Sequence, residues 1–177
     1  MVVSGAVEIA RRSIVSQHYL SDDTFFYILR ESPFVPPDLV WTFSRGFLRF
    51  FQGDFIGAVY MLVPLLENSL RHLLKSDGHD VTTFDDVHQT QQDRTISALF
   101  GHMRNELDDV LTKDITTDID NTFLSKLGPY LRHRVAHGLL DDAGPFRADA
   151  IYGCWLIFRL CMIPLFPHKK SIYFPFQ

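Results

Sequence analysis

The chain has 177 residues and a mass of 20.4 kDa, the size of one ordinary domain, which excludes two large independent cores. Its residues are 46% hydrophobic, 14% aromatic and only 21% charged, which excludes an intrinsically disordered chain. The formal net charge of −4 excludes non-specific binding of nucleic acid by a positive charge spread over the whole surface. Any contact with RNA therefore has to be local.

Cysteine usage and the apolar stretches predict a cytoplasmic protein. Cys154 and Cys161 are seven residues apart in a helix-like stretch, about 10 Å along a helix axis, which is too far for a disulfide bond. This pattern suits a reducing compartment. Charged residues interrupt the first apolar residues, so no export signal is expected. The best membrane candidate, 150–166, is only 17 residues long and contains Arg159, so we expect no membrane span.

The N-terminal part of the chain predicts short helices. A weakly amphipathic segment over 2–19 precedes a short aromatic helix over 24–31, for which Asp22 or Asp23 is the candidate N-cap. Apolar residues that recur three and four positions apart then predict a helix over 39–53.

The clearest helix is predicted over 54–75. Its apolar stripe consists of Ile56, Val59, Tyr60, Val63, Leu66, Leu70, Leu73 and Leu74. Glu67 and Arg71 lie on the opposite face. Because Pro64 removes one backbone hydrogen bond, a kink near Tyr60 is expected.

The middle of the chain is more polar. Residues 79–92 show no sustained apolar period, which predicts a long loop, and helical patterning resumes at about Asp93. The stretch 105–120 contains six acidic residues and one Lys, which we interpret as a solvated surface rather than an acidic binding surface.

The C-terminal part predicts the remaining helices. Gly128-Pro129 indicates the end of one helix and the start of the next, which carries residues 130–138. Residues 146–162 are apolar on almost every face and predict a central buried helix that packs on the helix over 54–75. The tail over 171–177 alternates aromatic and Pro residues and suits an extended segment. Because the rest of the sequence shows no stretch of alternating apolar and polar residues that would predict a β-strand, we predict an all-α bundle.

One short basic region lies between Asn121 and Leu140, where the sequence has no acidic residue. Its charged and imidazole side chains are Lys126, Arg132, His133, Arg134 and His137. His133 and His137 are four residues apart and share one helical face, with Arg132 about 100° away, so these three side chains could meet at one phosphate.

These residue types suit metal-free cleavage of a phosphodiester. The ribose 2′-hydroxyl would attack, Arg132 would stabilise charge on the nonbridging oxygens, and His137 would transfer a proton. His133 is a second candidate proton-transfer group. RNA would be cut and DNA would not. Two His and two Arg are also typical of an ordinary surface helix, so the residues alone leave both interpretations open.

A metal site is the third interpretation. His133 and His137 have the spacing of a two-His zinc helix, but the Glu of the H-E-x-x-H motif is missing and the sequence fixes no third ligand. We therefore expect neither a metal nor another cofactor.

The segment from Arg132 to His137 fits the R-x4-6-H motif and resembles the HEPN superfamily. More narrowly, 131–140 resembles an uncharacterised HEPN-like family with the signature Arg-Asn-x-x-x-His-Gly. Residues 63–74 are similar to that family's Pro-x-x-Glu-x-x-x-Arg helix, about 65 residues upstream. His133 stands where the narrower family usually has Asn.

The resemblance implies one HEPN-like helical domain over 1–177, with its motif-bearing part at about 47–164. It implies a homodimer in which the two motif helices face one another, and a metal-independent endoribonuclease or RNA-processing domain of a toxin, antiviral or similar system. The expected catalytic residues are Arg132, His137 and His133, the supporting residues are Glu67 and Arg71, and the RNA-binding residues are Arg134 and Lys126. The expected partners are RNA, a second copy of the chain, and an antitoxin or other regulatory protein.

Three alternatives remain open. The first is a noncatalytic HEPN-type module that binds RNA or nucleotide, or only dimerises. The second is that Glu67 and Arg71 form an ordinary ion pair on the helix surface, where such pairs contribute little. The third is a helical membrane-associated adaptor built on 150–166.

Overall fold

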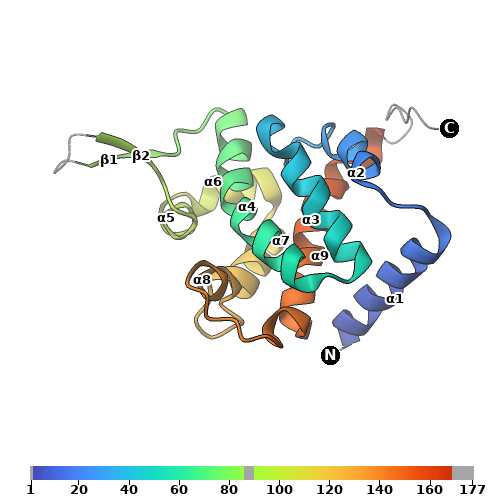
Figure 1. Ribbon diagram of the computed structural model, residues 1–177. Coiled ribbons are helices and arrows are strands. Elements are labelled where there is room, and N and C mark those ends of the chain that lie inside the picture. The colour runs from blue at the N-terminus through green and yellow to red at the C-terminus, as the bar shows by residue number, and fades with distance from the viewer. Residues whose placement is uncertain (1, 86–89, 169–177) are drawn as a thin grey trace.

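The computed structural model describes residues 2–85 and 90–168, which form a helical bundle with one small β-hairpin (Figure 1). The elements are α1 (Val2–Gln17), α2 (Asp22–Leu29), η1 (Pro37–Leu39), α3 (Val40–Gln52), α4 (Phe55–Ser76), β1 (Thr82–Asp85), β2 (Thr90–Asp93), α5 (Ile96–His102), α6 (Arg104–Leu111), α7 (Lys113–Ile119), η2 (Asp120–Leu124), α8 (Leu131–Ala136), η3 (Gly144–Phe146), α9 (Ala148–Met162) and η4 (Ile163–His168). The predicted all-α class is confirmed. The tail predicted over 171–177 lies outside the described residues.

Helices α3, α4 and α9 form the centre of the bundle. Helix α4 packs along α3 and against α9, which confirms the predicted packing of the helices over 54–75 and 146–162. Phenylalanines fill the space between α2, α3 and α9. Phe158 of α9 lies edge-on against Phe47 and Phe51 of α3, with ring centroids 5.2 Å apart in both pairs. Phe25 of α2 stacks on Phe51 at 5.4 Å.

The apolar stripe of α4 is partly different from the predicted one. The predicted residues Ile56 and Tyr60 are 48% and 40% exposed, so this part of the prediction is wrong. The buried residues of the helix are Phe55, Ala58, Val59, Leu62, Val63, Leu66, Ser69, Leu70 and Leu74. Since α4 is covered by α3 and by α9, its buried face is broader than one narrow stripe and is rotated away from Ile56. The helix is continuous across Pro64.

The predicted loop over 79–92 contains an antiparallel hairpin, so that prediction is wrong where the structure describes it. Strand β1 pairs with β2 in the register Thr82 to Asp93 and Thr83 to Gln92. Thr and Phe favour extended backbone, but strands of four residues are too short to give a recognisable alternating pattern. The hairpin extends away from the helices (Figure 1). Its base is closed by a hydrogen bond of 2.8 Å from the Arg94 amide to the Val81 carbonyl.

Several predicted helix starts are displaced by a few residues. The side chain of Ser21, not of Asp22 or Asp23, caps α2 and forms a capping box with Thr24. The helix predicted from Asp93 begins after Thr95, which caps it, and it is divided into α5 and α6 at Met103. These caps satisfy amide groups that the first helical turn leaves without partners.

Helix α8 begins later than predicted. The preceding helical segment, η2, ends at Leu124, and Pro129 is not the first residue of α8. Instead Tyr130 adopts a left-handed conformation with φ of 52°, and the helix starts at the next residue. The turn requires Gly128, because a Cβ there would lie 2.3 Å from the Asn121 carbonyl oxygen. Gly138, with φ of 64°, follows the helix.

Helix α9 is the predicted central buried helix, although it starts at Ala148 rather than Phe146. Among the described residues, one stretch, Ala148–Pro167, is long and apolar enough to cross a membrane by length and composition. A buried core helix passes the same test, and α9 packs against α1 and α4. Cys154 and Cys161 are free and buried, and burial raises the pKa of the Cys154 thiol to about 12. The expected absence of a disulfide between them is confirmed.

Gly153 lets α9 approach the start of α8 closely. A Cβ at this position would lie 2.6 Å from Cδ2 of the buried Leu131. We expect Gly153→Val to lower the free energy of unfolding by about 1–3 kcal/mol, because extra atoms in a packed core force their neighbours to move. Gly101→Ala on α5 is the control, since nothing lies within 4 Å of the added Cβ. Urea unfolding curves test this, and equal midpoints for both variants would contradict it.

Candidate functional site

Helix α8 carries the basic motif and lies against α4 and η2. Leu131 and Val135, four residues apart, are buried and attach one face of this short helix to the bundle. Arg132 and Ala136 follow on the next face, so they point toward α4. Local sequence therefore determines which side of α8 meets the rest of the molecule.

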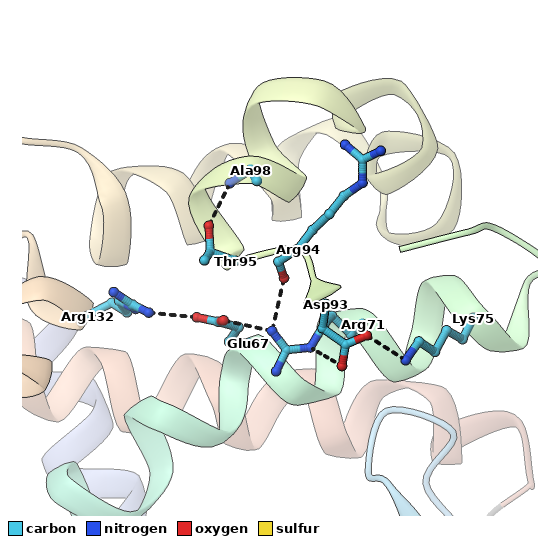
Figure 2. Close-up of polar contacts among 8 residues, drawn as sticks. All are labelled: Glu67, Arg71, Lys75, Asp93, Arg94, Thr95, Ala98 and Arg132. Carbon is cyan, nitrogen blue, oxygen red and sulfur yellow. Dashed lines mark hydrogen bonds and ion pairs between the residues drawn. The ribbon is translucent and has the colours of Figure 1, made fainter. Parts of the chain in front are cut away.

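Glu67 of α4 connects two arginines, as Figure 2 shows. Its Oε2 accepts a hydrogen bond of 2.9 Å from Nη2 of Arg132, 65 residues later in the chain. Its Oε1 accepts a bond of 2.7 Å from Nη1 of Arg71, one helical turn further along α4. The three predicted residues Glu67, Arg71 and Arg132 are thus brought together. An ordinary surface ion pair between Glu67 and Arg71 would describe only half of this arrangement, because Glu67 also binds Arg132.

The base of the hairpin holds the other side of this cluster. Nη1 of Arg71 also donates to the Arg94 carbonyl at 3.0 Å. Nε of Arg71 lies 3.8 Å from the Asp93 carboxylate, which accepts a hydrogen bond of 3.0 Å from Lys75. Sequence reasoning missed Asp93 and Arg94, because their contribution depends on the unrecognised hairpin.

Glu67 is a partly buried carboxylate whose side chain is 16% exposed. Burial alone would raise the pKa of Glu67, but hydrogen bonds from Arg71 and Arg132 outweigh it and hold this pKa below its usual value of 4.5. The charged form of Glu67 is therefore the one that the folded protein stabilises.

Glu67 consequently makes the stability of the fold depend on pH. Because its folded-state pKa is lowered, its contribution is fully present above about pH 4.5 and is lost as the pH falls through the lowered value. We expect Glu67→Gln to lower the free energy of unfolding at pH 7 by about 1–3 kcal/mol. On acidification this free energy should then fall less in the variant than in the wild-type chain. Asp109→Asn, on the exposed side of α6, is the control. Urea unfolding between about pH 7 and pH 3 tests this. Parallel pH curves for Glu67→Gln and the wild-type chain would contradict it.

The two motif histidines lie beside one another, although α8 ends earlier than predicted, so that His133 lies in the helix and His137 directly follows it. The rings of His133 and His137 have centroids 4.3 Å apart, and the ring of Tyr130 stacks on His133 at 4.5 Å. Partial loss of water around the ring, and then the charges of His137, Arg132 and Lys126, hold the pKa of His133 below its usual value of 6.5. His133 is therefore biased toward the neutral form, which can accept a proton.

The two residues predicted to bind RNA are placed differently. Lys126 is exposed in the turn before α8, and its charge acts on the His133 ring. Arg134 lies about 200° around the helix from Arg132, and its Nη1 is 3.8 Å from the Asp149 carboxylate of α9. Lys126 thus lies near His133, whereas Arg134 is directed toward α9.

An open pocket of about 290 Å³ lies between α4 and α8 and is lined by Val63, Pro64, Glu67, Arg71, Arg132 and Ala136. Neither His133 nor His137 lines it. Within one chain, Arg132 and the two histidines therefore lie on adjacent faces at α8 rather than around one common pocket.

A metal ion has no evident binding site in the part of the chain that the structure describes, since no three His, Cys, Asp or Glu side chains there are grouped suitably. No known family, curated protein or solved structure matches this chain in the comparisons made. The fold and the site thus define an all-α protein with two arginines joined by one carboxylate, beside a pair of neighbouring histidines.

Proposed function

We propose that this chain is a HEPN-like, metal-independent endoribonuclease or RNA-processing domain that acts as a homodimer in the cytoplasm. The observation that carries the proposal is the contact between Glu67 of α4 and Arg132 of α8, next to the neighbouring rings of His133 and His137. A preoriented guanidinium and a proton-transfer group are the parts that cleavage by a 2′-hydroxyl needs.

The proposed chemistry has one acceptor and one donor of protons. A neutral histidine takes the proton of the 2′-hydroxyl, which attacks the phosphorus, and a protonated histidine gives a proton to the departing 5′-oxygen. The guanidinium of Arg132 offsets the charge that develops on the nonbridging oxygens. The products are a 2′,3′-cyclic phosphate and a free 5′-hydroxyl.

Dimerisation would complete the site. In one chain Arg132 lines the pocket and the histidines lie on the next face of α8. A two-fold axis beside α8 would bring the histidines of one subunit to the arginine of the other, because such an interface joins the same surface of both subunits. His137 of one subunit would accept the proton and the same residue of its partner would donate it. An antitoxin or other regulatory protein that covers α8 would block this site.

Retention of RNA without cleavage is the second candidate function. It is favoured by the lining of the pocket, which contains Arg132 but neither His133 nor His137. Both functions need Arg132, whereas only cleavage needs His137.

Incubation of a generic RNA with the full chain in EDTA separates these functions. We expect cleavage by the wild-type chain and by His102→Ala, a control on the exposed end of α5, and a loss of at least about 100-fold in His137→Ala. RNA with 2′-deoxy substitutions should remain uncut. Cleavage that EDTA abolishes would contradict the metal-free mechanism. Binding without cleavage in the wild-type chain would favour the noncatalytic module.

A further inference from the structure

The pocket between α4 and α8 has a positively charged lining. Arg71 and Arg132 contribute two positive charges and Glu67 contributes one negative charge, so the lining carries a formal charge of +1. The whole chain, in contrast, has a net charge of −4. The lining of the pocket is therefore positive although the protein as a whole is negative.

The two guanidiniums are fixed before any ligand arrives. Each is bound by a different oxygen of the Glu67 carboxylate, so one side chain sets their relative position. Arg71 is fixed further by the Arg94 carbonyl at 3.0 Å and faces Asp93 at 3.8 Å. Side chains that are already ordered lose little conformational entropy when they bind a ligand.

Both arginines retain hydrogen-bond donors for a ligand. Each guanidinium has five N–H groups. Among the described residues, the single hydrogen bond of Arg132 uses Nη2, and both bonds of Arg71 use Nη1. The buried Nε of Arg71 donates no hydrogen bond there but faces the Asp93 carboxylate at 3.8 Å, so Nη2 is the end of this guanidinium that is left for a ligand. A planar fork with unused donors fits the tetrahedral oxygens of a phosphate group.

We propose that Arg71 is a phosphate-binding residue, and that it and Arg132 together hold one phosphate group of an RNA strand in this pocket. The proposal rests on the proposed function for the identity of the strand. Glu67 holds the two guanidiniums in place in the absence of RNA and competes with the phosphate for them. Arg71, on a different helix from the motif, thereby extends the RNA contact from α8 onto α4.

Calorimetric titration of the full chain tests the proposal with two probes at low salt. These are inorganic phosphate and an RNA oligonucleotide made uncleavable by 2′-deoxy substitution. We expect Arg71→Gln to weaken the binding of both probes by at least about fivefold. Arg71→Lys keeps the charge but loses the fork, and should bind at an intermediate level. Arg30→Gln, at the residue that follows α2, should change neither affinity, because α2 packs on α3 rather than beside the pocket.

Unchanged binding of both probes by folded Arg71→Gln and Arg71→Lys would overturn the proposal. A loss confined to inorganic phosphate would also overturn it, because the ligand would then be a free anion and not RNA. RNA cleavage is measured in parallel. If the wild-type chain cleaves RNA but the Arg71 variants bind both probes as it does, only the phosphate pocket is refuted. If the Arg71 variants bind the probes more weakly but the wild-type chain does not cleave RNA, only the ribonuclease proposal is refuted.

Discussion

Leu66→Asp is expected to unfold the protein. Leu66 lies on the buried face of α4 and is fully shielded from solvent. An aspartate there would place an unpaired carboxylate in the core, at a cost of several kcal/mol, which is comparable to the whole stability of a domain of this size. Circular dichroism and urea unfolding give the measurement.

Ile56→Asp is the matched control on the same helix. Ile56 is 48% exposed, so an aspartate at this position stays in water and should change the free energy of unfolding by less than about 1 kcal/mol. Cooperative unfolding of Leu66→Asp at the wild-type midpoint would contradict the assigned core.

Arg132→Ala is expected to reduce RNA cleavage by about 100- to 1,000-fold, the usual effect of removing one group that stabilises the transition state. The fold should remain, because the Arg132 side chain is 32% exposed and Glu67 keeps its bond to Arg71. Initial rates of cleavage in EDTA, together with a thermal unfolding curve, separate the loss of activity from a loss of structure.

Two further variants sharpen this result. Arg132→Lys should recover only part of the rate, because an ammonium group cannot fork onto two phosphate oxygens. Arg12→Ala on α1 removes one charge from a side chain that is 75% exposed and should cleave at the wild-type rate. Full activity in Arg132→Ala would remove that residue from the mechanism.

The large helices were predictable because burial leaves a periodic pattern. Helices α3 and α4 follow from apolar residues at helical spacing, and α9 follows from a stretch that is apolar on almost every face. The helix predicted over 39–53 ends at Gly53, which has φ of 86°. Exact faces were harder to predict, since Ile56 is as apolar as its buried neighbours and only the positions of α3 and α9 decide which residue is covered. The hairpin could not be predicted, because its strands are only four residues long and the described residues of β2 are all exposed, so burial leaves no alternating pattern in them.

The site was predictable only in part. The resemblance of two segments to one family singled out Glu67 and Arg132, which lie in contact across 65 residues of sequence. Closeness in the sequence grouped Arg134 with Arg132, although a step of two residues turns a helix by about 200° and places the two side chains on opposite sides. Asp93 and Arg94 carried no signal, because an aspartate and an arginine after a polar stretch are typical of any surface.

Mixing two inactive variants tests the shared site most directly. Arg132→Ala and His137→Ala are each expected to form homodimers that do not cleave RNA. Combined in equal amounts, they would form heterodimers in which one cleft retains an intact Arg132 and an intact His137, so weak EDTA-resistant cleavage should return. Each variant alone, at the same total protein concentration, is the control. If the wild-type chain instead cleaves RNA at concentrations where sedimentation finds only monomers, the site does not span two subunits.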